Sequence, residues 1–246
     1  MVGRRGLFVA EGTVVVRALC NSLRFRPQSL LVLENRLAGL SEMIDGLDES
    51  IPVYIVDRAL IDAIAGFPMH RGVLAIGERN HEEDALSLAD SFGSSALVVV
   101  CVGIGSHDNM GAIFRNAAAF GAATVLCDET CCDPLYRKAL RVSVGSVLKV
   151  PYARAGAASS IVDLLTARGF RQYALSPGGA TSIRDLRPNG RTALYLGAEG
   201  DGLPHQVMER MEAVSIPMTP GFDSLNVAAA SAIALHQLFA GRTALG

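Results

Sequence analysis

The feature that most constrains the fold is an alternation, in the second part of the chain, of wholly apolar runs with segments of helical spacing. The run ALVVVCVGI, residues 96–104, carries no polar side chain, and such a run is typical of a strand buried on both faces of its sheet. Strands of this kind that alternate with helices predict a parallel sheet covered on both sides. Ligands of such sheets bind beyond the carboxyl ends of the strands.

The same pattern divides the 246 residues into three parts. Residues 1–80 predict a small α/β unit of short apolar strands, and the polar stretch RNHEEDALSLAD predicts a linker or a short exposed helix between domains over residues 81–94. Residues 95–246 form the larger predicted domain. Its expected strands are 96–104, 123–129, 146–153, 171–176, 192–199 and 213–218, and its expected helices are 109–120, 136–141, 158–168, one after Pro204, and 224–239.

Charge gives two competing indications about a partner. The formal net charge is -2 at pH 7, which offers no general argument for nucleic acid. Residues 1–36, however, hold six arginines and two acidic residues, an asymmetry that favours an anionic partner. Ordinary solvated arginines explain this count equally well, because only two of the 22 basic residues are lysines and the whole chain prefers arginine.

Cysteine usage and hydropathy predict a cytoplasmic protein without a metal or a membrane span. The five cysteines are an odd number without a CxxC pair, so we expect reduced thiols. Cys131 and Cys132 have only Asp133 nearby, which is too few ligands for a metal site. The longest uncharged run, residues 94–106, is shorter than the about 20 residues of a membrane span, and the first residues lack the pattern of a signal peptide.

A nicotinamide or flavin oxidoreductase is one function to weigh, because Gly103 and Gly105 follow a predicted strand. The next glycine is Gly111, six positions on, whereas the dinucleotide fingerprint has its third glycine three positions on. The loop therefore lacks the tight turn that a bound pyrophosphate requires. This spacing argues against a dinucleotide site.

Three other stretches carry more polar residues and glycines than their predicted elements need. SHDNMGAIFRNAAAFGA (106–122) passes from strand to helix with an Asn, a Gly and an Arg. LGAEGDGLP (196–204) leaves a strand through three glycines around an acid, and lacks the Lys and Ser or Thr of a phosphate-binding P-loop. IPMTPGFDSLNVAAASAIALHQL (216–238) places Ser224 to cap the last helix and Asn226 in its first turn, where free N–H groups favour an anion.

The arginine of the first stretch has a defined place on its predicted helix. If Asn109 caps that helix, Gly111 and Arg115 share one face four residues apart. The missing side chain at Gly111 leaves room for a substrate beside the guanidinium of Arg115. The buried stripe of the same helix is expected at the i, i+3, i+4, i+7 positions: Met110, Ile113, Phe114 and Ala117.

Together the three stretches resemble the signature of the SpoU family of RNA ribose methyltransferases, part of the trefoil-knotted SPOUT class. The segment RVSVGSVLKVPY (141–152) also looks like the part of the family between its first two blocks, so the resemblance spans about residues 96–240. Residues 1–80 resemble, more weakly, a ribosomal-protein-like RNA-binding domain. The matching positions are Asn109, Gly111 and Arg115; then Gly197, Glu199, Gly200, Gly202 and Leu203; and then Ile216, Pro217, Met218, Ser224, Leu225, Asn226 and Val227.

The resemblance implies a knotted parallel-sheet domain that transfers a methyl group from S-adenosylmethionine to the 2′-hydroxyl of a ribose in structured RNA, either tRNA or rRNA. It places six residues at the cofactor: Gly197, Gly200, Gly202, Leu203, Ile216 and Leu225. It also implies catalytic roles for five residues, with Arg115 oriented by Asn109, Glu199 fixing its loop or orienting substrate, and Ser224 and Asn226 holding the ribose-phosphate. Arg115 either helps to remove the hydroxyl proton or stabilises the developing alkoxide while another group takes the proton.

The Ala-rich helix positions 228–232 permit close approach of another helix. Together with the family resemblance, they lead us to expect a homodimer built on the C-terminal domain. The alternative function from a different class is a non-catalytic RNA-binding or assembly factor that keeps the fold.

Overall fold

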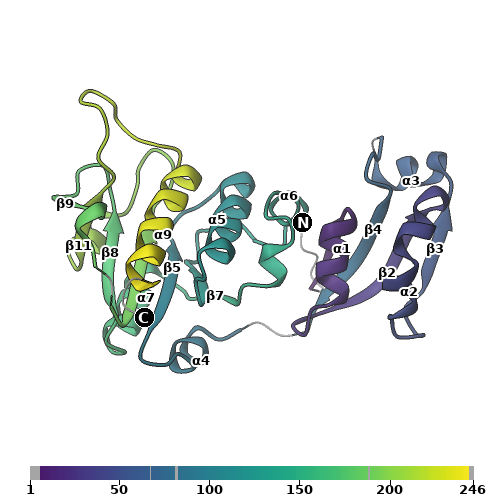
Figure 1. Ribbon diagram of the computed structural model, residues 1–246, viewed down its shortest axis with the longest axis horizontal. Coiled ribbons are helices and arrows are strands. Elements are labelled where there is room, and N and C mark those ends of the chain that lie inside the picture. The colour runs from purple at the N-terminus through teal and green to yellow at the C-terminus, as the bar shows by residue number, and fades with distance from the viewer. Residues whose placement is uncertain (1–5, 67, 81–82, 188, 244–246) are drawn as a thin grey trace. The chain divides into compact units, whose positions relative to one another are not determined.

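The computed structural model describes residues 6–66, 68–80, 83–187 and 189–243, and the chain forms two compact units (Figure 1). The first unit comprises residues 1–82 and 133–149, and the second comprises residues 83–132 and 150–246. The larger domain predicted over 95–246 is thus interrupted. Residues 133–149 pack with the first unit because Arg137 pairs with Glu11 and because Gly145 lies so close to the first helix that a Cβ there would be 2.9 Å from the Cβ of Ala18.

The first unit contains a four-stranded sheet in the order β1-β4-β2-β3. Strand β4 is antiparallel to both β1 and β2, whereas β2 and β3 are parallel. The strands are β1 (Leu7–Glu11), β2 (Phe25–Leu33), β3 (Val53–Val56) and β4 (Val73–Arg79). The helices are α1 (Thr13–Cys20), α2 (Ser41–Asp45), α3 (Arg58–Ala65) and α6 (Arg137–Val142), with 3₁₀ turns η1 (Glu34–Leu40) and η2 (Ser146–Leu148).

Local sequence explains where the helices of the first unit begin, end and pack. The Asp57 carboxylate caps α3 by accepting the N–H of Leu60 at 2.8 Å, and Gly66 ends the helix in the left-handed conformation. Helix α3 buries Ile61 against the sheet. Helix α1 buries an apolar stripe that includes Val15 and Leu19.

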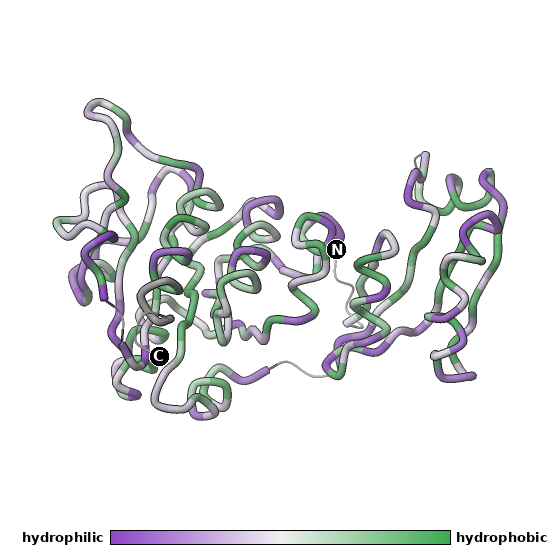
Figure 2. Tube along the Cα trace, viewed as in Figure 1, coloured by the Kyte–Doolittle hydropathy of each residue, from purple (hydrophilic) through white to green (hydrophobic). Residues whose placement is uncertain are grey.

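The second unit contains a seven-stranded sheet in the order β7-β6-β5-β10-β8-β11-β9. All of its described strand pairings are parallel, which confirms the parallel sheet that the apolar runs predict. Strand β5, which lies between β6 and β10, is hydrophobic along its whole length (Figure 2). The strands are β5 (Ala96–Cys101), β6 (Thr124–Cys127), β7 (Tyr152–Arg154), β8 (Arg171–Leu175), β9 (Thr181–Ser182), β10 (Arg191–Leu196) and β11 (Glu212–Ser215).

Helices cover both faces of this sheet. Val98 and Val100 of β5 belong to the core that includes Ile161 and Leu165 of α7, while α5 packs against α9 and presents its stripe to the other side. All four residues predicted for that stripe are 0% exposed, which confirms the helical spacing. The helices are α4 (Ala85–Asp90), α5 (His107–Ala119), α7 (Ala158–Thr166), α8 (His205–Met208) and α9 (Val227–Thr243), with the 3₁₀ turn η3 (Ile183–Asp185).

Two expected elements differ from the structure. Residues 146–148 form η2 and not a strand, because Val144 and Gly145 both have positive φ and turn the chain before it reaches β7. The stretch expected as a linker or short exposed helix contains the helix α4, whose first turn is capped by Asp84, but the helix is not wholly exposed, because Ala89 is 0% exposed. Residues 81 and 82 of that stretch lie outside the described residues.

Within the ranges that the structure describes, no helix is both long and apolar enough to cross a membrane.

Candidate functional site

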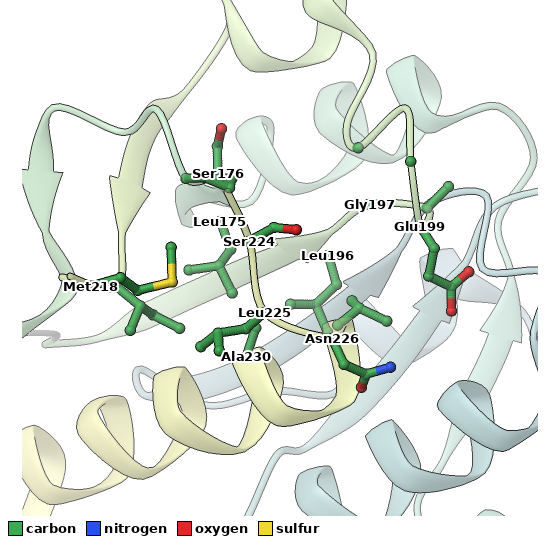
Figure 3. A pocket seen from close by; sticks show the side chains of 16 residues that line it. Leu175, Ser176, Leu196, Gly197, Glu199, Met218, Ser224, Leu225, Asn226 and Ala230 are labelled. Carbon is green, nitrogen blue, oxygen red and sulfur yellow. The ribbon is translucent and has the colours of Figure 1, made fainter. Parts of the chain in front are cut away.

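A pocket of about 280 Å³ lies where the carboxyl ends of three neighbouring strands meet the start of α9 (Figure 3). Its walls come from Leu196 and the loop after β10, from Leu175 and the loop after β8, and from Ile216 after β11. Parallel strands bring their carboxyl ends to one edge of the sheet, so three segments distant in sequence converge there. The location agrees with the general rule for ligand sites in such sheets.

The loop after β10 folds back on itself at the edge of the pocket. Ala198 and Gly202 pair as an isolated antiparallel bridge. A Cβ at Gly197 would lie 2.3 Å from the carbonyl carbon of Gly202 and 2.4 Å from the nitrogen of Leu203, both backbone atoms. Gly200 and Gly202 have positive φ values of 97° and 69°. The three glycines of this loop are therefore required by a close backbone approach at one position and by left-handed geometry at two.

Asn226 caps the last helix. Its Oδ1 accepts the N–H groups of Ala228 at 2.9 Å and Ala229 at 3.3 Å. The prediction that Ser224 caps a helix starting at 224 is wrong, because α9 begins at Val227 and the side-chain oxygen in reach of its free N–H groups belongs to Asn226. Ser224 instead lines the pocket ahead of the helix.

A directed hydrogen-bond chain links this cap to the glycine loop. Because Oδ1 of Asn226 is an acceptor, its Nδ2 is the donor, and it donates to Oδ1 of Asn109 at 3.1 Å. Nδ2 of Asn109 in turn donates to Oε1 of Glu199. The chain runs from the positive end of α9 to a carboxylate, so each amide has one defined orientation. Figure 3 shows the side chains of Glu199 and Asn226 at the same end of the pocket, with Met218 at the other end.

Helix α5 is held in register with α9 by a second polar contact. Nδ2 of Asn116 donates to the carbonyl of Ala228 at 2.9 Å and to Oγ of Ser231 at 2.8 Å. Ser231 is 0% exposed. This contact fixes the first turn of α9 against α5 and so brings Asn226 to Asn109.

The start of α5 is held by groups that precede it. The helix begins at His107, and Oγ of Ser106 accepts the N–H of Asn109 at 3.4 Å, so the expectation that Asn109 is the cap is wrong by three residues. Asp128, at the end of β6 and 4% exposed, accepts the N–H of Gly103 at 3.1 Å and that of Cys131 at 3.0 Å. The loop between β5 and α5 is thereby tied to the loop after β6.

The structure gathers most of the sequence-predicted site residues but not all of them. Asn109 adjoins the pocket through Glu199 and Asn226. Leu203 is 5% exposed and belongs to the core of the second unit, and it does not line the pocket. The predicted residues that line the pocket are Gly197, Glu199, Gly200, Gly202, Ile216, Ser224, Leu225 and Asn226.

Arg115 stands apart from this group. It lies on α5 with an exposed side chain, and with the described residues it makes no hydrogen bond or ion pair. The hydrogen bonds of the Asn109 amide go to Glu199 and Asn226 and not to Arg115. Among the residues that the structure describes, none therefore occupies the hydrogen-bonding groups of this guanidinium.

Several lining residues were not predicted from the sequence. Ser176 and Pro177 follow β8, and Ala230 lies one turn into α9. The run SPGG after an apolar strand was the available signal, because polar residues and turn formers at a carboxyl strand end mark a ligand loop. A group of three or more His, Cys, Asp or Glu side chains suited to a metal ion does not occur in the described part of the chain.

Comparisons with known proteins agree on one family. The model of the SpoU rRNA methylase family matches residues 96–236. An uncharacterized tRNA/rRNA methyltransferase of Mycobacterium bovis is 38% identical over 238 residues, which cover 95% of this chain and 81% of the relative. The same identity and coverage hold for an uncharacterized tRNA/rRNA methyltransferase of Mycobacterium tuberculosis.

Two solved structures share the fold over nearly the whole chain. The SpoU methyltransferase AviRb from Streptomyces viridochromogenes matches with a TM-score of 0.86 and 22% identity, covering 98% of this chain and 91% of that one. An AdoMet-bound rRNA methyltransferase from Sinorhizobium meliloti matches with a TM-score of 0.81 and 23% identity, covering 98% and 88%.

Proposed function

The chain belongs to the SpoU rRNA methylase family, and we propose that it transfers a methyl group from S-adenosylmethionine to the 2′-hydroxyl of a ribose in tRNA or rRNA. The observation that carries the proposal is the pocket bounded by the glycine loop and the capped start of α9. The Asn226–Asn109–Glu199 chain at one end of that pocket adds oriented polar groups next to a site of cofactor size. Oriented polar groups beside an apolar cavity are the usual form of a small-molecule site.

The lining of the pocket fits S-adenosylmethionine. Leu175, Met218 and Leu225 offer apolar contact, and Gly197 lets the loop fold back tightly beside the pocket, because a Cβ there would overlap the backbone of Gly202 and Leu203. When bound, S-adenosylmethionine supplies an electrophilic methyl group on a sulfonium centre. The residues proposed to hold it are Gly197, Gly200, Gly202, Ile216 and Leu225. Leu203 supports the loop from the core instead of touching the ligand.

The remaining proposed roles concern the ribose. A hydroxyl is a weak nucleophile, so the rate depends on holding it in line and at near-attack distance. Asn226 and Ser224 bind the ribose-phosphate near the positive end of α9, and Glu199 fixes the loop through Asn109. Arg115 stabilises the negative charge that develops on the ribose oxygen, as a positioned hydrogen-bond donor does at a developing anion.

We further propose that the active form is a homodimer. Arg115 makes no hydrogen bond or ion pair with the described pocket residues, so we infer that one copy holds an incomplete catalytic set. Helix α9 exposes Ile233 at 45% and Phe239 at 41%, and the segment before it exposes Phe222 at 66%. Such apolar exposure on neighbouring elements fits a second copy of the chain. Sedimentation at assay concentration tests this, and a fully active monomer would contradict it.

The family assignment also supports three proposals about organisation. We expect the trefoil knot of the SPOUT class in the second unit, RNA binding by residues 1–80, and a cytoplasmic location.

Mapping of 2′-O-methylation tests the proposed reaction directly. Total RNA from cells with and without the active protein should differ at one ribose, and the purified protein with S-adenosylmethionine should restore that methyl group. Isothermal titration of the protein with S-adenosylmethionine tests the alternative function, a non-catalytic RNA-binding factor, because such a factor has no use for this cofactor. Cofactor binding without any methylated ribose, or with methylation on a base, would refute the proposed reaction.

A further inference from the structure

The sheet of the first unit has one covered face and one partly open face. Side chains alternate along β1, so Phe8 and Ala10 share one face and Val9 and Glu11 share the other. Phe8 and Ala10 are at most 2% exposed. Helix α3 covers the Val9 face only at the end where Leu33 and Leu74 pack with Ile61.

The uncovered end of that face forms an apolar groove of about 290 Å³. The strand register brings Val9 opposite Ile76, and Leu31 opposite both Leu74 and Tyr54, so these side chains lie on one surface. Tyr54 on the edge strand β3 is 56% exposed, and Ile64 on α3 is 57% exposed. The groove therefore presents one aromatic ring and several aliphatic side chains to solvent.

A cluster of three arginines adjoins this groove. Arg137 lines the groove, and its Nε donates to Oε2 of Glu11 at 2.9 Å. Guanidinium nitrogens of Arg71 and Arg141 lie 4.0 Å from the same carboxylate. The side chain of Glu11 is 5% exposed, whereas those of Arg71 and Arg141 are 50% and 40% exposed. One buried carboxylate thus faces three guanidinium groups, and the rim keeps an excess of positive charge.

We propose that this groove binds one unstacked nucleotide of the RNA substrate, with its base against Tyr54 and its phosphate at Arg71 and Arg141. The proposal rests on the proposed function, which makes RNA the substrate. Single-stranded RNA is recognised by stacking of splayed bases on aromatic side chains. The planar fork of arginine matches a phosphate with two parallel hydrogen bonds.

The positive charge of Arg71 and Arg141 beside the groove favours a nucleotide over a purely apolar ligand. An apolar helix of a protein partner would fill the groove but leave two guanidinium groups without a counter-charge. A nucleotide supplies both a planar base and an adjacent anion. Arg137 is already bonded to Glu11 and 28% exposed, so its role is to hold the carboxylate that positions the other two arginines.

The test uses the full-length protein and a fluorescein-labelled single-stranded oligoribonucleotide of mixed sequence, with its duplex as a second probe. Tyr54→Ala should weaken single-strand binding about ten-fold, within the range for one stacked base, and leave the salt dependence unchanged. Arg71→Gln combined with Arg141→Gln should reduce the slope of log Kd against log salt by about 0.7, since the two arginines hold one phosphate and each phosphate contact on a single strand contributes about 0.7.

Two matched controls come from the same unit. Ile55 neighbours Tyr54 on β3, points to the opposite face and is 52% exposed, and Arg17 is an exposed arginine on α1. Ile55→Ala and Arg17→Gln should each leave affinity within about two-fold of wild type. Circular dichroism melting confirms that each variant is folded.

Three results would overturn the proposal. If Tyr54→Ala bound the single-stranded RNA as tightly as wild type, the groove would not be a nucleotide site and a different ligand, such as a protein, would have to be considered. Equal losses in Arg17→Gln and in the double arginine variant would mean diffuse charge attraction. In the groove variants, cofactor affinity and the single-turnover methyl-transfer rate at saturating RNA should equal those of wild type. If these variants also bind RNA as tightly as wild type, the proposed nucleotide site is wrong while the proposed methyl-transfer function stands. A wild-type protein that binds neither probe and methylates no RNA rejects the proposed function as well.

Discussion

Replacement of Gly197 by alanine tests whether the glycine loop forms the cofactor site. The added Cβ would lie 2.3, 2.4 and 2.7 Å from three backbone atoms of Gly202 and Leu203, where ordinary contact begins at 3.4 Å. The neighbouring atoms are backbone, so no side-chain rotation relieves the overlap, and the two arms of the loop must separate by roughly 1 Å, an overpacking change that costs about 1–3 kcal/mol.

The same displacement of the loop should weaken the binding of S-adenosylmethionine. Gly197, Gly200 and Gly202 all line the pocket, so opening the fold-back moves three walls at once. We expect Gly197→Ala to bind S-adenosylmethionine at least about ten-fold more weakly, equivalent to about 1.4 kcal/mol. Isothermal titration measures the affinity, and urea unfolding measures the change in stability.

A matched glycine separates this effect from a general one. Gly105, in the loop between β5 and α5, has no heavy atom within 4 Å of a Cβ position and no positive φ. Gly105→Ala should therefore leave stability and cofactor affinity unchanged. If Gly197→Ala bound S-adenosylmethionine within about two-fold of wild type, the fold-back would not be part of the cofactor site.

Three further predictions follow from single side chains. Arg115→Ala should lower the single-turnover methyl-transfer rate by roughly two to three orders of magnitude while cofactor affinity and fold stay intact, and a rate within ten-fold of wild type would remove Arg115 from catalysis. Asp128→Ala should destabilise the second unit by about 1–3 kcal/mol in urea unfolding, because the N–H groups of Gly103 and Cys131 lose their acceptor. The hydrogen bond with Cys127, together with burial, raises the pKa of the Cys131 thiol well above its ordinary 9.0. The unfolded chain therefore ionises first, and the stability from this thiol is present below that value and lost as the pH rises above it. Wild type should accordingly lose more unfolding free energy between about pH 8 and about pH 10 than Cys131→Ala, and equal losses would contradict this.

Prediction from sequence worked where the deciding interactions are local. The buried stripe of α5 follows from residue spacing, and inner strands such as β5 follow from apolar runs that are typical of buried strands. Helix boundaries were less accurate. The cap of α9 is Asn226 and not Ser224, and both residues are good caps, so sequence alone does not choose between them.

The grouping of residues 133–149 with the first unit shows a different limit. These residues lie between two strands of the second unit in sequence, yet Arg137 and Arg141 gather around Glu11 of β1. An ion pair across more than a hundred residues leaves no periodic trace in the chain. The arginine cluster and the groove beside it therefore became visible only in the structure.

The sequence by itself determined most strands of the second unit, which loop needs glycine, and which family the chain resembles, because these depend on local backbone geometry and on the order of motifs. The tertiary structure alone decided which loops share the pocket. Strand order places β8 between β10 and β11, which brings Ser176 and Met218 to the site. It also decided that Asn226 meets Asn109, 117 positions earlier, because the packing of α5 against α9 sets the distance between their side chains.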